Sequence, residues 1–162
     1  MVDESGSIGS TNFNLTKQFL SQAVGGLDVD SGNTRVGLVT YSSGVGTTIN
    51  LNDHSFVASL QSAISALSYA AGGTNTAQAL VHVRTRMLTS AAGDRSKATN
   101  VIVVLTDGMS NVNAANTPAS IKLTFRSYRC LYNCCRHRRH YYLLLAACTL
   151  PLAGSVHQRM PD

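Results

Sequence analysis

Cysteine is absent from the first 122 residues of this 162-residue chain, and all four cysteines come later. This stretch therefore has no disulfide framework and carries no information about the redox compartment of the protein. Charged residues are scarce, at 13% of the chain, and no apolar run before residue 123 is long enough to cross a bilayer as a helix. Apolar residues make up 44%, which favours one globular domain over a disordered chain.

Net charge is also lacking in residues 1–122. They hold seven Lys and Arg side chains and seven Asp and Glu side chains, so the whole excess of +5 comes from residues 123–162. A neutral stretch offers no electrostatic footprint for nucleic acid or for an anionic membrane. Composition thus predicts a neutral domain over residues 1–122, followed by a basic, cysteine-containing segment over residues 123–162.

Hydrophobic periodicity predicts alternating helices and strands in the neutral domain. Apolar residues recur at helical spacing in three segments, 12–25, 55–67 and 77–88. Runs of β-branched and aromatic residues predict three strands, 34–43, 46–51 and 100–108, and the last is typical of a parallel strand buried on both faces. This alternation predicts an α/β fold, a doubly wound and mainly parallel sheet with flanking helices.

Small oxygen-bearing side chains gather in three predicted loops at the carboxyl ends of strands. "DESGS" carries Asp3, Ser5 and Ser7, "GGTNT" carries Thr74, and "LTDG" carries Asp107. Ligands of doubly wound sheets bind where such loops meet. Oxygen ligands without His or Cys suit a hard cation such as Mg²⁺. Where hydroxyls dominate the direct contacts, the ion keeps positive charge that attracts an anionic oxygen from a partner.

These three loops resemble the metal-ion-dependent adhesion site of von Willebrand factor type A domains, a module also inserted in integrins. "NTRVGLVTYSS" and "LTDGMSN" are most similar to copies in collagen VI-type and matrilin-type matrix proteins, and the resemblance covers residues 2–122. It implies a Rossmann-like fold without enzymatic activity. It also implies a divalent cation, Mg²⁺ with Mn²⁺ or Ca²⁺ as alternatives, held by Asp3, Ser5, Ser7, Thr74 and Asp107.

The same resemblance implies a partner and a location. A matrix or cell-surface protein would supply an Asp or Glu carboxylate that completes the coordination, with no nucleic acid and no membrane span involved. The counterpart of Thr74 in the family binds the ion directly in the ligand-competent state and through water otherwise. The parent protein would accordingly be extracellular or secreted, although no signal peptide occurs in this chain.

The chain departs from the family pattern at both ends. The family places an apolar strand before the DESGS loop, at the centre of the sheet, and only Met1 and Val2 of it are present, so we expect the first strand to be missing. After residue 122 the family continues with the rest of a helix, a strand, a helix and a last strand. Residues 123–162 have no alternating pattern that would dock on a sheet, and we expect them to be disordered or an artefact of a gene model.

Alternatives from other functional classes stay open. The chain could be an intracellular accessory module of a chelatase-type ATPase or of a copine-like membrane assembly, a non-functional fragment, or a binder of nucleic acid or membrane through its basic segment. The cysteines of that segment, with two nearby histidines, match no common zinc pattern. They are Cys130, Cys134, Cys135, Cys148, His137 and His140.

The remaining motifs predict less. Neither His54 nor His82 has the sequence context of a catalytic base. "DVDSG" at 28–32 begins like a calcium loop but lacks the glycine and the closing glutamate that such a loop requires, so a turn is expected there. Asn14 opens a glycosylation triplet, within a predicted helix.

Overall fold

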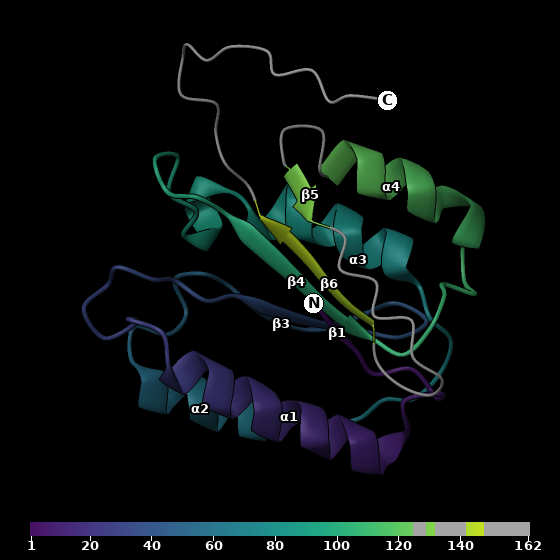
Figure 1. The fold of residues 1–162 in the computed structure, drawn as a ribbon, viewed down its shortest axis with the longest axis horizontal. Helices are drawn as coiled ribbons and strands as arrows, with labels where there is room; N and C mark the ends of the chain where they lie inside the picture. Colours follow the sequence, from purple (N-terminus) through teal and green to yellow (C-terminus); the bar gives the residue numbers. More distant parts are fainter. Residues whose placement is uncertain (125–128, 132–141, 148–162) are drawn as a thin grey trace, which may run out of the picture.

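A computed structural model describes residues 1–124, 129–131 and 142–147 of the chain. The strands in these residues form one sheet of six, in the order β3-β2-β1-β4-β6-β5 (Figure 1). They are β1 (Val2–Asp3), β2 (Leu38–Tyr41), β3 (Val45–Ile49), β4 (Val101–Thr106), β5 (Arg129–Leu131) and β6 (Tyr142–Ala147). Only the central strands β2, β1 and β4 are paired in parallel, so the sheet is mixed, whereas the sequence predicted mainly parallel pairing.

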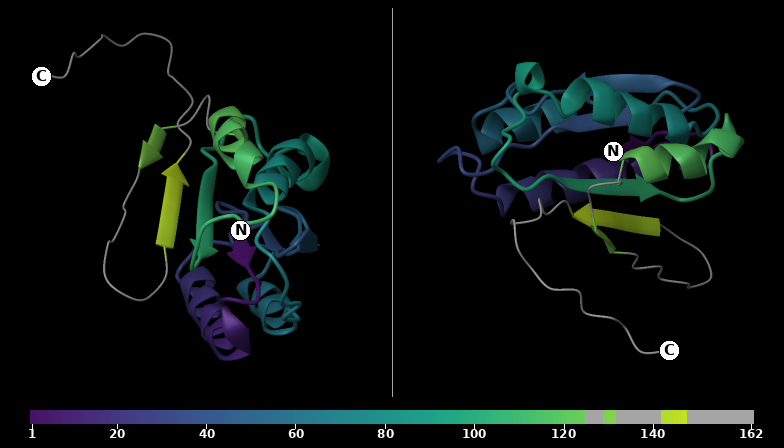
Figure 2. Two further views of the ribbon diagram at one scale, coloured as in Figure 1. Left: turned by 90° about the vertical axis from the view of Figure 1, so that its right-hand side faces the viewer. Right: turned by 90° about the horizontal axis from the view of Figure 1, so that it is seen from above.

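Helices cover both faces of this sheet. They are α1 (Gly9–Gly25), α2 (Val57–Ser65), α3 (Thr76–His82) and α4 (Thr117–Thr124), and a π-helical turn, η1 (Val83–Met87), continues α3. The helices α1 and α2 lie on one face, and α3 and α4 lie on the other (Figures 1 and 2). Two buried apolar clusters, one on each face, fill the space between helices and sheet. In the described residues no helix is both long and apolar enough to cross a membrane.

Helix α1 begins earlier than its sequence pattern predicts. The apolar spacing predicts a start near residue 12, whereas the helix starts at Gly9, directly after Ile8. Ile8 makes no side-chain cap but is buried, so its burial fixes the start of the helix in place of a polar cap. Phe13 and Val24 are the buried residues of the helix, and Phe19 stays half exposed.

Strand β1 is short but occupies the centre of the sheet. The sequence predicted that the first strand is missing apart from Met1 and Val2, and the structure has a strand of two residues, in which Val2 pairs with Thr40 of β2 and with Leu105 of β4. Hydrogen bonding to β4 extends to the residue before β1, where the Met1 amine donates to the Val103 carbonyl at 2.7 Å. The two residues of β1 therefore join the two halves of the sheet.

Two further strands lie in the segment for which the sequence predicted none. Strand β6 pairs with β4 in antiparallel fashion over six residues, and β5 pairs with the outer edge of β6. The expectation that residues 123–162 contribute nothing to the sheet is therefore wrong for these nine residues. The cysteines and histidines at 134, 135, 137, 140 and 148 lie outside the described residues.

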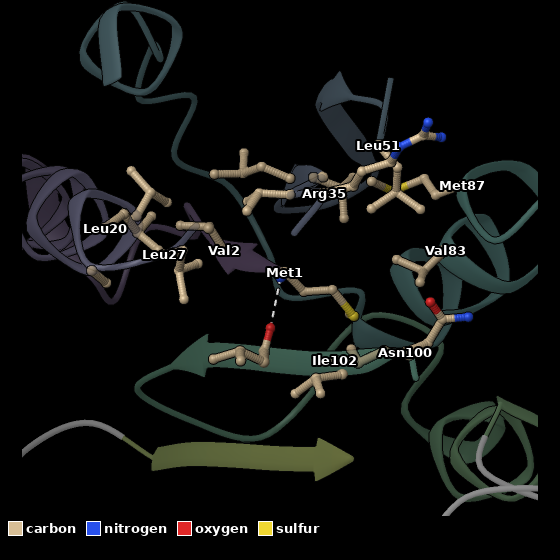
Figure 3. Close-up of a pocket in the computed structure, with 18 of the residues that line it drawn as sticks. Met1, Val2, Leu20, Leu27, Arg35, Leu51, Val83, Met87, Asn100 and Ile102 are labelled. Atoms are coloured by element: carbon tan, nitrogen blue, oxygen red, sulfur yellow. Dashed lines mark hydrogen bonds between the residues drawn. The ribbon is translucent and has the colours of Figure 1, made fainter. Parts of the chain in front are cut away.

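A cavity of about 540 Å³ lies beside β1. Leu20 of α1 and Leu27, just after that helix, line it from one face of the sheet, and Val83 and Met87 of η1 line it from the other. Met1 stands in its middle, above β4, with its amine bonded to that strand (Figure 3). The cavity therefore runs through the sheet between β2 and β4, in line with β1, and its walls are mostly apolar.

Candidate metal centre

Three parallel strands end at the same level and place three side chains in one row. Asp3 pairs with Tyr41, and because Val2 pairs with Leu105, Asp3 lies level with Thr106. Residues at the same level of neighbouring strands point to the same face of a sheet. Tyr41, Asp3 and Thr106 thus form a row across β2, β1 and β4, which we call the strand-end row.

The loop after β1 connects this row to the loop after β4 through a chain of hydrogen bonds. The Ser5 amide donates to Asp3 Oδ1 at 2.9 Å, and Ser5 Oγ lies 3.2 Å from Ser7 Oγ. The Ser7 hydroxyl donates to Asp107 Oδ1 at 3.0 Å. Four of the five predicted ligands are therefore neighbours, although Ser7 and Asp107 are 100 positions apart in the sequence.

Thr106 fixes the orientation of the Asp3 carboxylate. Its hydroxyl donates to Asp3 Oδ2 at 2.6 Å, while the Gly108 amide donates to the same hydroxyl at 3.3 Å. Both described partners of the carboxylate, the Ser5 amide and the Thr106 hydroxyl, are neutral donors. The carboxylate is thereby held in place without a basic side chain at these contacts.

The fifth predicted ligand, Thr74, is held through its backbone. Its amide donates to Asn111 Oδ1 at 2.7 Å, and its carbonyl accepts from the amides of Asn111 and Val112. The Ser110 hydroxyl donates to the same carbonyl at 2.9 Å. The Thr74 hydroxyl takes no part in these four bonds, which position the residue against the loop after β4.

Glycines allow the loops to approach each other closely. The Gly6 amide donates to the Gly72 carbonyl at 2.8 Å and so joins the DESGS loop to the GGTNT loop. A Cβ atom on Gly73 would lie 2.6 Å from a methyl group of Val112, closer than real side chains come. Gly72 has a φ of +104°, which a residue with a side chain rarely adopts. The sequence "GG" before Thr74 is thus required for the loops to meet.

Burial divides the five predicted ligands into two groups. Asp3, Ser5 and Thr74 are at most 3% exposed, whereas Asp107 is half-buried and Ser7 is exposed. A buried carboxylate is costly unless a positive charge or several donors compensate it. The site therefore has a buried side, where Asp3 lies, and a side open to solvent, where Ser7 lies.

Two further ionisable groups next to Asp3 are buried. Burial raises the pKa of Tyr41, and the nearby Asp3 carboxylate raises it further. Burial also raises the pKa of Glu4, a hydrogen bond from Thr40 opposes that rise, and Asp3 again adds to it. Burial is the main cause of both shifts, so both groups lie in surroundings that solvent hardly reaches.

The donor set fits a hard divalent cation. The described residues contain no cluster of three or more His, Cys, Asp or Glu side chains, so a nitrogen or sulfur site is not built there. Two carboxylates and two serine hydroxyls adjoin, and the Tyr41 hydroxyl is buried beside them without a partner among the described residues. An unsatisfied buried hydroxyl next to a buried carboxylate is a structural sign that a polar species belongs at this place.

Sequence reasoning missed the residues that support the ligands. Thr106 orients Asp3, and Asn111 holds Thr74, yet neither was a candidate. Thr106 stands directly before Asp107 in "LTDG", where a hydroxyl at the end of a strand could have been noticed. The role of Asn111 depends on a contact 37 positions away, which no local pattern contains.

The other sequence candidates lie away from this site. His54 contacts the Ser59 hydroxyl and His82 contacts the Thr48 hydroxyl. The "DVDSG" segment forms a turn, as expected: Asp28 accepts from the Asn33 side chain, and Asp30 accepts from the Val57 amide at the start of α2. Asn14 lies in α1 and is exposed.

Comparisons with known proteins identify the relatives of this chain. The family model of the von Willebrand factor type A domain matches residues 1–129, which extends past residue 122. The collagen alpha-4(VI) chain of Mus musculus is 37% identical over 124 residues, which is 75% of this chain and 5% of that protein. Human matrilin-4 is 41% identical over 113 residues, which is 68% of this chain and 18% of matrilin-4. The chain thus spans a small part of these relatives.

Solved structures have the same fold. Proximal thread matrix protein 1 from the mussel byssus superposes with a TM-score of 0.64 at 27% identity, over 70% of this chain and 30% of that one. Another structure of the same mussel protein, described as having a zinc-occupied MIDAS motif, superposes with a TM-score of 0.62 at 24% identity. That structure covers 75% of this chain and 34% of its own, and the likeness at this identity concerns the fold.

Proposed function

The chain belongs to the von Willebrand factor type A domain family, and from this premise we propose that it is a divalent-cation-dependent binding module of an extracellular matrix protein or cell-surface protein. Its matrix relatives, the collagens and matrilins, support the extracellular location. The observation that carries the proposal is the hydrogen-bonded chain from Asp3 through Ser5 and Ser7 to Asp107.

Each predicted ligand has a distinct part in this proposal. Ser5, Ser7 and Thr74 would hold the cation through their hydroxyls, and Asp3 and Asp107 would hold it directly or through water. Neutral hydroxyls leave much of the charge of the ion uncompensated, so the ion supplies an electrophilic centre for an incoming carboxylate. We infer Mg²⁺ as the natural ion, with Mn²⁺ or Ca²⁺ as alternatives, because all the donors are oxygen atoms.

The open side of the site is where a partner would bind. Ser7 is exposed and Asp107 is half-buried, so an Asp or Glu side chain of another protein can approach the ion from solvent. Next to them, Met109 is 90% exposed and adds apolar surface at the rim. An acidic side chain flanked by apolar residues would therefore match this surface. The proposed activity is binding, without catalysis, since His54 and His82 lie at other hydroxyls.

The test is adhesion to an immobilised extract of extracellular matrix. We expect the chain to bind in Mg²⁺, to be released by EDTA, and to bind at least about tenfold less when Asp107 is replaced by Ala, which removes a charged ligand. Amidation of the carboxyl groups of the matrix should abolish binding in the same way. Asp53→Ala is the matched control, because Asp53 is an exposed acid in a turn away from the site.

Adhesion that persists in EDTA and in Asp107→Ala would contradict the cation mechanism. Adhesion that needs the cation but survives amidation of the matrix would contradict the proposal that the partner supplies a carboxylate. It would leave the cation mechanism standing. Calorimetric titration of Mg²⁺ into the wild-type chain and the Asp107→Ala variant measures the ion separately from the partner.

A further inference from the structure

Tyr41 has a hydroxyl group that nothing else in the described structure accounts for. Its side chain is completely buried at the end of β2, and its hydroxyl has no hydrogen-bond partner among the described residues. Buried hydroxyls are nearly always satisfied by protein or by an ordered water molecule. The Tyr41 hydroxyl is one of three such atoms among the described residues, with Asp94 Oδ1 and Thr117 Oγ1, and it neighbours the Asp3 carboxylate of the candidate metal centre.

The surroundings of the hydroxyl are defined by the strand-end row. Asp3 lies between Tyr41 on one side and Thr106 on the other. The Asp3 carboxylate already accepts from the Ser5 amide and from the Thr106 hydroxyl, one bond on each oxygen.

The neighbours of the hydroxyl belong to the metal centre. The carboxylates of Asp3 and Asp107 both act on Tyr41 and raise its pKa, after burial as the main cause. The side chains of Thr76, the first residue of α3, and Thr106 act on its oxygen as hydrogen-bonding groups and oppose this rise, although neither makes a hydrogen bond of ordinary geometry to it. The hydroxyl is therefore a buried polar group beside the two carboxylates of the site, and it can both donate and accept a hydrogen bond.

We propose that the Tyr41 hydroxyl is a positioning group of the cation site, whose oxygen accepts a hydrogen bond from a water molecule in the coordination shell of the ion. The inference rests on the cation site of the proposed function. Asp3 needs a bridging water if it holds the ion indirectly, and a water bound to a cation donates its two protons to acceptors on fixed groups. The Asp3 carboxylate is one acceptor, and the Tyr41 hydroxyl oxygen is the other.

If Tyr41 has this positioning role, removing its hydroxyl affects the stability of the cation-free chain and the affinity for the cation in opposite directions. Without the cation the hydroxyl is unsatisfied, so its removal should leave the chain as stable as before or more stable. With the cation the hydroxyl makes one net hydrogen bond, so its removal should weaken cation binding by about 2- to 10-fold. If Tyr41 had only a structural role, removal of its hydroxyl would change the stability of the chain in EDTA and would leave the dissociation constant of the cation unchanged.

The test is the Tyr41→Phe variant, which removes one oxygen atom and keeps the buried ring. Calorimetric titration with Mg²⁺, and then with Mn²⁺, gives the dissociation constant, and thermal unfolding in EDTA gives the stability without the ion. Tyr69→Phe is the matched comparison, because the Tyr69 hydroxyl donates to the Ser5 carbonyl at 3.0 Å. We expect Tyr69→Phe to lower the melting temperature in EDTA and Tyr41→Phe not to lower it.

The outcomes separate the inference from the proposed function. If the wild-type chain binds neither ion, the proposed function is overturned, because it requires a cation site. If the wild-type chain binds and Tyr41→Phe binds equally well, only the role of Tyr41 is overturned. A lower melting temperature of Tyr41→Phe in EDTA would also overturn it, because the hydroxyl would then have a partner without the ion.

A spectroscopic readout on the wild-type chain adds an independent check. Cation binding should perturb the near-ultraviolet absorption of tyrosine, since the Tyr41 hydroxyl gains a hydrogen bond. The perturbation should be smaller in Tyr41→Phe than in the wild-type chain. A perturbation of equal size in both would contradict the inference.

Discussion

The amine of Met1 shows how the burial of one group controls the response of the whole chain to pH. It is enclosed between β2 and β4 and donates to the Val103 carbonyl. Burial lowers its pKa from 8.0 to about 5. The folded state therefore contains a neutral amine over a pH range in which the unfolded chain carries a protonated one.

This shift predicts that acid destabilises the chain below pH 8. Between pH 8 and about pH 5 the unfolded state binds a proton that the folded state does not, so the free energy of unfolding falls as the pH falls. A pKa difference of about three units lowers the free energy of unfolding by at most about 4 kcal/mol. Urea unfolding at several pH values measures this loss.

Acetylation of the amine provides the control, because it removes the titrating group and should remove this slope. Burial raises the pKa of Glu4, so Glu4 contributes stability at low pH that is lost as the pH rises above 4.5. Both chains contain Glu4, and the difference between them isolates Met1. Identical slopes for the acetylated and free chains would show that the amine is not buried in solution.

At the scale of elements, β1 is the shortest strand and adjoins the cavity. Val101 of β4 lines that cavity and is 57% exposed, and Val36, before β2, lines it from the other side. Apolar side chains placed between these two segments would be buried on both faces of the sheet. The sheet therefore has space for a longer β1.

We predict that a short Val- and Ile-rich extension before Met1 stabilises the chain. An extension of equal length made of Gly and Ser is the matched control, because it also converts the amine into an amide. Filling the cavity with one or two branched side chains should raise the free energy of unfolding by about 2 kcal/mol over the control. The measurement is urea unfolding of both variants, and equal midpoints would rule out occupation of the cavity.

The sequence predicted the order of most elements because their patterns are local. The spacing of Phe13 and Val24 indicates α1, and the apolar run of β4 indicates a central strand. Strand ends and β6 were not predicted, since β6 is stabilised by pairing with β4, a contact between distant segments. The continuation of α3 as a π-helical turn also has no local signal.

The candidate site also contains some residues that the sequence predicts and others that it does not. The five proposed ligands lie in short motifs and could be found from the sequence. Tyr41 and Thr106 could not, because their roles come from the register that places them on either side of Asp3. Register results from the burial of the whole sheet and is not encoded in any one segment.

At the scale of the whole molecule, the metal centre connects the beginning of the described chain to its later part. Ser7 bonds to Asp107, Asp3 bonds to Thr106, and the loop of Thr74 bonds to Asn111. Unfolding of either half therefore destroys the site. A cation that binds this site binds the folded chain and has little affinity for the unfolded one.

We predict that Mg²⁺ raises the stability of the whole chain. At a free concentration of about 100 times the dissociation constant, the gain in the free energy of unfolding is about 2.7 kcal/mol. Urea unfolding in Mg²⁺, compared with EDTA plus NaCl of equal ionic strength, measures this gain. Asp107→Ala should remove most of the gain and Asp53→Ala should retain it. Equal urea midpoints in Mg²⁺ and EDTA would count against a cation at this site.

The hydrogen bond between Asp3 and Thr106 joins residues 103 positions apart, which has a consequence for the synthesis of the protein. The ribosome adds Asp3 to the polypeptide more than a hundred residues before it adds Asn111. At about 5–20 residues per second, this interval lasts several seconds. During that time the growing polypeptide has no complete site, so it cannot capture an ion or an acidic partner before both halves of the sheet have been made.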